Sequence, residues 1–272
     1  MKTITVILAI AFVVPGAASF ETFTGHDHGL GGAMVLSDPS PSEAAIIPTV
    51  SDSMQFGFET GYQRRFELRA LDRLFFAAVT RKGGWSTALT LNQFGHADLY
   101  RELTARIGIG RDFGCWAATV SWSGMLVDFG ADYERLKAGT MNLGLACTRG
   151  RVHAALAANN LTSPNLGTGP PDFKPDYTLY TELAVMGRHS LLARVTLQVD
   201  SRPRFGLGQV INLADHSALL WGVSTAPTQY GVGIRIGLGA RSLTYCTRYH
   251  PILGFTHSLS LRLGIARRPP TR

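Results

Sequence analysis

The chain has 272 residues, of which 45% are hydrophobic and only 17% are charged, and its formal net charge at pH 7 is +7. This length suits one large domain. Its three cysteines, Cys115, Cys147 and Cys246, are widely spaced, so they indicate neither a disulfide framework nor a zinc knuckle. Most basic residues are scattered singly, which argues against a nucleic-acid-binding stripe, and we expect no nucleic-acid partner.

The N-terminus has the pattern of a secretory signal peptide. Lys2 precedes an uncharged run over residues 4–14, which is followed by Pro15 and by small residues over 16–19. The run is too short to span a bilayer, and no later stretch reaches the 18 or more apolar residues that a membrane-spanning helix needs. We therefore expect residues 1–19 to act as a leader and the mature protein to be exported.

The next segment, residues 20–53, shows no regular alternation because glycines and prolines interrupt it. It nevertheless contains apolar residues, among them Met34, Val35, Ile46 and Ile47. A disordered tail does not usually carry so many apolar side chains. We predict a folded, plug-like segment.

From Met54 onward, apolar and polar residues alternate, most clearly over 230–239 and 255–265. Successive strand residues point to opposite faces, so this pattern builds strands with one apolar face and one face of glycines, hydroxyls and arginines. Turn signals separate strands of about ten residues. The predicted strands are 54–63, 67–80, 84–94, 101–111, 115–128, 138–149, 151–161, 177–187, 190–200, 204–214, 217–226, 229–241, 243–250 and 253–266.

About fourteen antiparallel strands over residues 54–266 fit an all-β fold, a transmembrane up-and-down barrel, followed by a basic tail at 267–272. The alternative is a soluble antiparallel sandwich whose apolar face packs on its own core. The export leader and the length of the strands favour the membrane barrel.

Alternation also places a set of charged residues opposite the aliphatic residues of their strands. In a membrane barrel these residues must face the lumen, because an arginine on the lipid face costs about 2–4 kcal/mol at mid-bilayer. We expect these residues first to stabilise the interior as arginine–carboxylate pairs. The more specific alternative is that they line a selective pathway for a solute. The predicted lumen-lining residues are Glu59, Arg106, Glu182, Arg194, Asp200, Arg235, Arg248 and Arg262.

We find no motif that indicates an enzyme. The sequence lacks a Walker loop, a Gly-x-Ser-x-Gly elbow and an HExxH motif. His26, Asp27 and His28 are adjacent potential metal ligands, but a glycine-flanked polar loop explains them as well and no further ligands are near in the sequence. We expect no catalytic residue, no metal and no cofactor.

Three short motifs, in order along the chain, carry a resemblance to a known family. They are Gly29-Leu30-Gly31-Gly32-Ala33 with Asp38-Pro39-Ser40 and Ile47-Pro48, then Asn159 to Pro164, then Tyr249 to His257. Together they resemble the FadL-type outer-membrane transporters and the related PorV/PorQ-type barrels. The chain departs from the family pattern at Ile47 and Thr49, and in its basic C-terminal tail.

The resemblance implies a fourteen-stranded barrel in the cell outer membrane, with its lumen plugged by the N-terminal segment. Gly31, Gly32, Asp38, Pro39 and Pro48 would be plug residues. It implies either passive transport of small hydrophobic molecules or, in the PorV branch, a non-transporting role beside secretion-system proteins that place cargo on the cell surface. The short predicted loops favour transport, with membrane lipid and a small hydrophobic ligand as partners.

Overall fold

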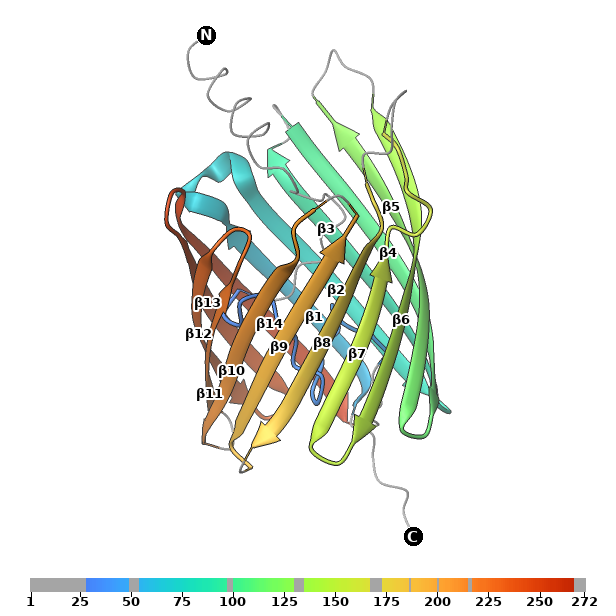
Figure 1. The fold of residues 1–272 in the computed structure, drawn as a ribbon, viewed down its shortest axis with the longest axis vertical. Helices are drawn as coiled ribbons and strands as arrows, with labels where there is room; N and C mark the ends of the chain where they lie inside the picture. The colour runs from blue at the N-terminus through green and yellow to red at the C-terminus, as the bar shows by residue number, and fades with distance from the viewer. Residues whose placement is uncertain are drawn as a thin grey trace.

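Fourteen antiparallel strands close into one barrel, in which β1 pairs with both β2 and β14 (Figure 1). The computed structural model describes residues 28–48, 54–96, 100–129, 135–166, 173–185, 187–199, 201–214 and 217–266. The predicted fold class is confirmed. The strands are β1 (Met54–Arg64), β2 (Asp72–Lys82), β3 (Trp85–His96), β4 (Tyr100–Phe113), β5 (Trp116–Asp128), β6 (Leu136–Arg149), β7 (Val152–Asn159), β8 (Asp176–Val185), β9 (His189–Gln198), β10 (Arg204–Ala214), β11 (Ser217–Ser224), β12 (Gln229–Leu238), β13 (Arg241–His250) and β14 (Gly254–Ala266).

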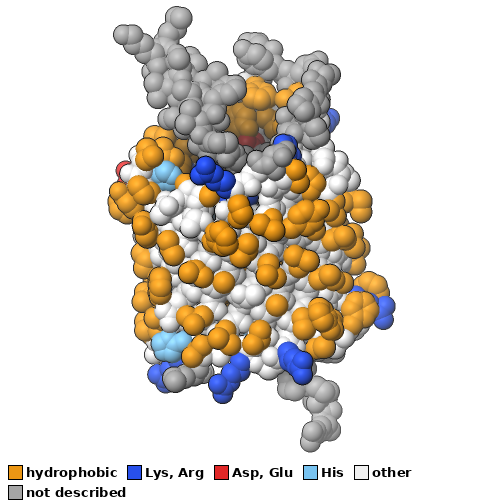
Figure 2. Space-filling model, in the orientation of Figure 1, with side chains coloured by type: hydrophobic (Ala, Val, Ile, Leu, Met, Phe, Trp, Pro, Cys, Tyr) orange, Lys and Arg blue, Asp and Glu red, His pale blue; other side chains and the backbone are white. Residues whose placement is uncertain are grey.

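The barrel has an apolar outside and a largely polar inside. On β14, Leu259 and Leu261 are exposed on the outer face, whereas Ser258 and Ser260 are buried on the inner face. The same period of two recurs around the wall, and Figure 2 shows hydrophobic side chains spread over its surface. A closed sheet whose apolar side chains point away from its own interior excludes the sandwich alternative. No helix in the described residues is long and apolar enough to cross a membrane.

The two ends of the barrel differ in the length of their joins. At the end where β14 finishes, the joins are 83–84, 114–115, 150–151, 186–188, 215–216 and 239–240. At the other end they include 65–71, 129–135 and the longest, 160–175. We call these the short-turn end and the long-loop end. The same asymmetry, with short periplasmic turns and longer extracellular loops, is typical of outer-membrane barrels.

Two strand boundaries differ from the predicted ones for a local reason. The strand predicted from residue 67 begins at Asp72, because Arg65–Glu67 and Arg69–Leu71 form two 3-10 turns, η1 and η2, and Phe66 and Glu67 have positive φ. The strand predicted over 151–161 ends at Asn159, because Asn160 has a φ of 56° and leaves the ladder. None of these three left-handed residues can continue a strand.

Residues 28–48 run inside the ring of strands, as the blue trace in Figure 1 shows. Most of this segment is buried, and Leu30, Ala33 and Ala45 have no exposed surface. Residues 28–31 pass along β10 to β13, and residues 40–47 form a compact helical turn in which the Ile47 amide donates to the Glu43 carbonyl at 2.9 Å. We call residues 28–48 the inner segment.

Candidate functional site: the barrel lumen

The first turn of the inner segment lies against glycines of the barrel wall. These glycines are Gly208 on β10, Gly222 on β11 and Gly231 on β12. A Cβ at Gly222 would lie 2.3 Å from the carbonyl carbon of Leu30, and one at Gly231 would lie 2.0 Å from the His28 carbonyl oxygen. Real Cβ atoms are not found this close to backbone atoms. Any larger residue would therefore displace the inner segment, and we call these positions the glycine track.

Gly31 and Gly32 turn the inner segment away from this track. Both have positive φ, 62° and 80°, which glycine adopts without the cost that a Cβ brings. A Cβ at Gly32 would lie 2.4 Å from a terminal nitrogen of Arg194 on β9, so the guanidinium of Arg194 packs directly on this glycine. The positive φ restricts position 32 to glycine, and a larger residue there would also displace the flexible end of the Arg194 side chain.

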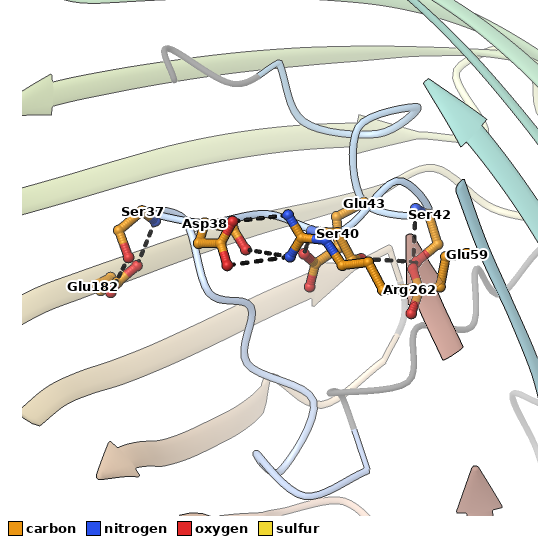
Figure 3. A network of polar contacts seen from close by, with 8 residues as sticks. All are labelled: Ser37, Asp38, Ser40, Ser42, Glu43, Glu59, Glu182 and Arg262. Carbon is orange, nitrogen blue, oxygen red and sulfur yellow. Dashed lines mark hydrogen bonds and ion pairs between the residues drawn. The ribbon is translucent and has the colours of Figure 1, made fainter. Parts of the chain in front are cut away.

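Past the turn, the inner segment makes two charged contacts with opposite sides of the barrel (Figure 3). The Asp38 carboxylate accepts two hydrogen bonds from the Arg262 guanidinium on β14, at 2.8 and 3.2 Å. The amide and the hydroxyl of Ser37 both donate to the Glu182 carboxylate on β8, each at 2.7 Å. Adjacent residues of the inner segment thus connect β8 with β14 across the lumen.

A third contact joins the helical turn of the inner segment to β1. The Ser42 hydroxyl donates to the buried Glu59 carboxylate at 2.7 Å. The turn is held locally by the Glu43 carboxylate, which accepts a hydrogen bond from the Ser40 amide at 2.6 Å. Ser40 and Glu43 have the Ser-x-x-Glu spacing of a capping box, and Pro41 occupies the first helical position, where proline is favoured. The local sequence therefore favours this turn independently of its contacts with the barrel.

Apolar packing completes the seat of the inner segment at the short-turn end. Met34, Ile46 and Ile47 pack in one cluster with the wall residues Ala146, Ala155, Ala157 and Tyr180. A cavity of about 10 Å³ remains in this region, between Pro39 and Pro48 of the segment and Thr148 and His153 of the wall. That volume is about the size of one water molecule, so the segment and the wall pack closely around this cavity.

At the long-loop end, the inner segment begins at His28, which is buried beside polar wall residues. The His28 ring contacts the Gln63 amide on β1, and the His28 carbonyl accepts a hydrogen bond from Arg248 on β13 at 3.5 Å. Burial and the positive charges of Arg248, Arg65 and Arg73 lower the pKa of His28 well below its ordinary value. The ring is neutral at physiological pH in consequence.

The other predicted lumen residues are placed as follows. Arg106 on β4 is buried and donates to the Ser123 hydroxyl on β5 at 2.7 Å. Arg235 on β12 lies on the inner face, within electrostatic reach of Asp38, Glu43 and Glu182. Asp200, His26 and Asp27 fall outside the described residues. The seven described members of the predicted set, Glu59, Arg106, Glu182, Arg194, Arg235, Arg248 and Arg262, point to the inner face of their strands.

The serines that contact these charges, Ser37, Ser42 and Ser123, were missed by the sequence reasoning, which considered charged groups only. A usable signal existed for Ser123. It alternates with the outward residues Trp122 and Gly124, so the same rule that places Arg106 on the inner face of β4 also places Ser123 on that face. For Ser37 and Ser42, no periodicity was available because the inner segment is irregular.

The wall is incomplete between β6 and β7 near the long-loop end. The β6–β7 ladder starts at Leu143 and Ala158, so residues 136–142 of β6 have no strand partner on this side within the described part of the chain. In place of a strand, the Leu161 amide donates to the Met141 carbonyl at 3.0 Å and the Thr162 hydroxyl contacts that of Thr140 at 3.1 Å. Among the described residues, the loop that leaves β7 is what closes this edge of the sheet.

Apolar side chains line the lumen beside that edge. Met125 and Val127 on β5 and Phe173 from the long loop are buried together, with Leu136 and Leu166 packed against them. On the outer face at the same level, the Trp122 ring lies over Gly124 and Gly139, which face each other on β5 and β6. The unpaired edge therefore has an apolar lining inside and an indole over two glycines outside.

Several solved structures share this barrel architecture. No family model and no curated protein matches the chain. The toluene transporter TodX of P. putida matches with a TM-score of 0.67 at 10% sequence identity, covering 91% of this chain and 100% of that one. A TodX mutant described as a monoaromatic hydrocarbon channel gives 0.64 at 8% identity, covering 91% and 100%. The Acinetobacter baumannii outer membrane protein Omp33 gives 0.53 at 6% identity, covering 79% and 99%.

The fold is that of bacterial outer-membrane barrels. At such low identity the likeness concerns the fold alone. It supports the FadL-type resemblance at that level and does not bear on the PorV/PorQ branch.

Proposed function

We propose that this protein is an outer-membrane barrel that passively transports small hydrophobic molecules. The solute would enter from the long-loop end, contact the apolar cluster of Met125, Val127 and Phe173, and leave sideways between β6 and β7 into the membrane. We also propose that the inner segment acts as a plug and that the protein is not an enzyme. The solved barrels named as a toluene transporter and a monoaromatic hydrocarbon channel support the solute class.

The observation that carries the proposal is the unpaired edge of β6 at 136–142 beside the apolar cluster. An unpaired strand edge is costly where it meets hydrocarbon, because lipid offers no hydrogen bonds to backbone groups, and the exposed Lys137 marks the outer limit of that part of the edge. A complete ladder would be the more stable wall. The inner segment packs tightly at the short-turn end, so a hydrophobic solute that reaches the cluster has its shortest exit through this edge.

A disulfide across the edge tests the proposed exit. The hydroxyls of Thr140 and Thr162 are 3.1 Å apart, so Thr140→Cys with Thr162→Cys can tie the loop to β6. The matched control is Thr178→Cys with Thr196→Cys, whose hydroxyls are 3.0 Å apart across the complete β8–β9 ladder. Cys115, which is exposed, is replaced by serine in both variants.

The readout is uptake of radiolabelled toluene into vesicles that contain the purified full-length barrel. We expect oxidation to lower uptake at least tenfold in the Thr140/Thr162 variant and reduction to restore it, with no change in the control. Uptake that survives the disulfide would overturn the lateral exit. Wild-type uptake no faster than that of empty vesicles would overturn transport itself.

A further inference from the structure

The outer wall at the short-turn end carries a belt in which cationic and aromatic side chains alternate from strand to strand. Lys82 on β2 is the ladder partner of Trp85 on β3, which is in turn the partner of Arg111 on β4. Phe113 is the partner of Trp116 on β5. Arg149 on β6 continues the row two residues beyond Cys147, which pairs with Trp116. The six belt residues, Lys82, Trp85, Arg111, Phe113, Trp116 and Arg149, are all exposed.

Arg111 occupies the centre of the belt. Its guanidinium carbon lies 4.8 Å from the centroid of the Trp85 ring and 5.6 Å from that of Phe113. Such cation–π contacts position the guanidinium without neutralising its charge. On the same face of β4, Ile109 and Ile107 are exposed, so the charge lies where the apolar wall ends. An arginine near the edge of a barrel's apolar band costs about 0–1 kcal/mol, which makes this depth suitable for it.

The charge at this end is strongly one-sided in the described residues. Further exposed cations are Arg151, Arg188 and Arg241, and Figure 2 shows Lys and Arg side chains along the lower edge of the wall. The described carboxylate at these turns is that of Asp112, which alternation places on the opposite face from Arg111. Tryptophan rings favour the headgroup level of a bilayer, and clustered cations there attract anionic lipid.

We propose that the belt formed by Lys82, Arg111 and Arg149 with Trp85, Phe113 and Trp116 binds the phosphate groups of anionic phospholipids in the leaflet at the short-turn end. Arginine donates in a planar fork that matches phosphate oxygens, and the adjacent rings pack against the glycerol and upper acyl region. The belt adjoins the exposed apolar wall. A membrane lipid therefore fits this site, because its acyl chains can lie along that wall while its phosphate contacts the belt. This inference does not depend on whether the barrel transports a solute.

Lipid retention by the purified full-length barrel in neutral detergent tests the proposal. Native mass spectrometry measures bound phosphatidylglycerol during titration, with phosphatidylcholine and inorganic phosphate as separate arms. We expect phosphatidylglycerol to bind at least tenfold more tightly than phosphatidylcholine, and inorganic phosphate not to compete at equal concentration. Arg111→Gln should weaken phosphatidylglycerol about fivefold, the effect expected for one basic side chain at an anionic lipid surface.

The triple variant Lys82→Gln, Arg111→Gln and Arg149→Gln should lose about a hundredfold in affinity, whereas Lys137→Gln, an exposed position on β6 at the long-loop end, should lose nothing. Faster migration on gels without boiling verifies that each variant is folded, and Arg149→Gln replaces Arg111→Gln if the latter fails this check. Equal binding of the two phospholipids would overturn the proposal. So would unchanged affinity in the triple variant, an equal loss in Lys137→Gln, or equal competition by inorganic phosphate.

Discussion

Asp38 and Arg262 form a two-point ion pair between the inner segment and the last strand, with nitrogen–oxygen distances of 2.8 and 3.2 Å. The Arg262 side chain is 11% exposed, whereas that of Asp38 is 53% exposed. The two residues lie 224 positions apart in sequence, so this contact ties the inner segment to the last strand of the barrel. The position of the segment therefore depends on β14.

Removing one charge of this pair should loosen the inner segment without unfolding the wall. Asp38→Asn is expected to cost about 1 kcal/mol of stability, a value reduced from that of a buried charged pair because Asp38 is half exposed. Urea unfolding in vesicles measures this change. The matched control is Arg64→Gln on the outer face, whose partner Asp72 lies on β2. A stability loss in the control at least as large as that in Asp38→Asn would contradict the role given to the pair.

The glycine track should be intolerant of one methyl group. Gly222→Ala places a Cβ 2.3 Å from the Leu30 backbone, so the barrel is expected to fold while the inner segment is displaced. Single-channel conductance should rise as a result. In the control, Gly110→Ala, the closest atoms are the hydroxyls of Ser86 and Thr119, which can rotate away. If both variants conduct like the wild type, the inner segment does not depend on this track.

The loss of stability caused by a charge on the outer face should depend on the depth of that residue in the bilayer. Leu261 lies at the middle of β14 and Ile265 near its end, and both are exposed on the same face. Leu261→Arg should destabilise the barrel in vesicles by about 2–4 kcal/mol, and Ile265→Arg by about 0–1 kcal/mol. Equilibrium unfolding in urea compares the two. Equal costs would mean that this strand does not cross the hydrocarbon layer.

Lowering the pH should weaken the contacts that hold the inner segment inside the barrel at His28. While the inner segment is in place, burial and then the charges of Arg248, Arg65 and Arg73 lower the pKa of His28. When the segment leaves the lumen, the solvated histidine has a pKa of about 6.5. As the pH falls below about 6.5, the released state takes up a proton that the seated state does not, so seating becomes less favourable. Conductance should therefore rise between pH 7.5 and pH 5.5. In His28→Gln it should stay flat, and an unchanged pH response in this variant would exclude His28 as the cause.

Alternation alone predicted the wall well because a membrane barrel imposes opposite solvents on its two faces. Strands such as β10 and β14 were placed to within a residue at each end. The same rule placed residues such as Glu59 and Arg106 on the inner side of their strands. It could not name their partners, since the contacts of Glu182 with Ser37 and of Arg262 with Asp38 depend on the path of an irregular segment.

The unpaired edge of β6 also escaped prediction. The predicted strand runs to Leu161, although the polar residues Asn159 and Asn160 interrupt its alternation, and the backbone turns at Asn160. The local signal was present, since asparagine tolerates positive φ better than most residues, and Pro164 follows closely. Alternation reports which face a residue takes, and it does not report whether a neighbouring strand lies beside it.

The most direct test of the account measures hydrocarbon uptake and ion conductance on one preparation of the full-length barrel in vesicles. We expect rapid toluene uptake together with negligible ion conductance, because the solute would leave through the wall while the inner segment fills the lumen. Deletion of residues 20–53 should raise ion conductance by at least tenfold in a barrel that still folds. Wild-type barrels that conduct ions freely, or that take up no toluene above empty vesicles, would contradict the central claim.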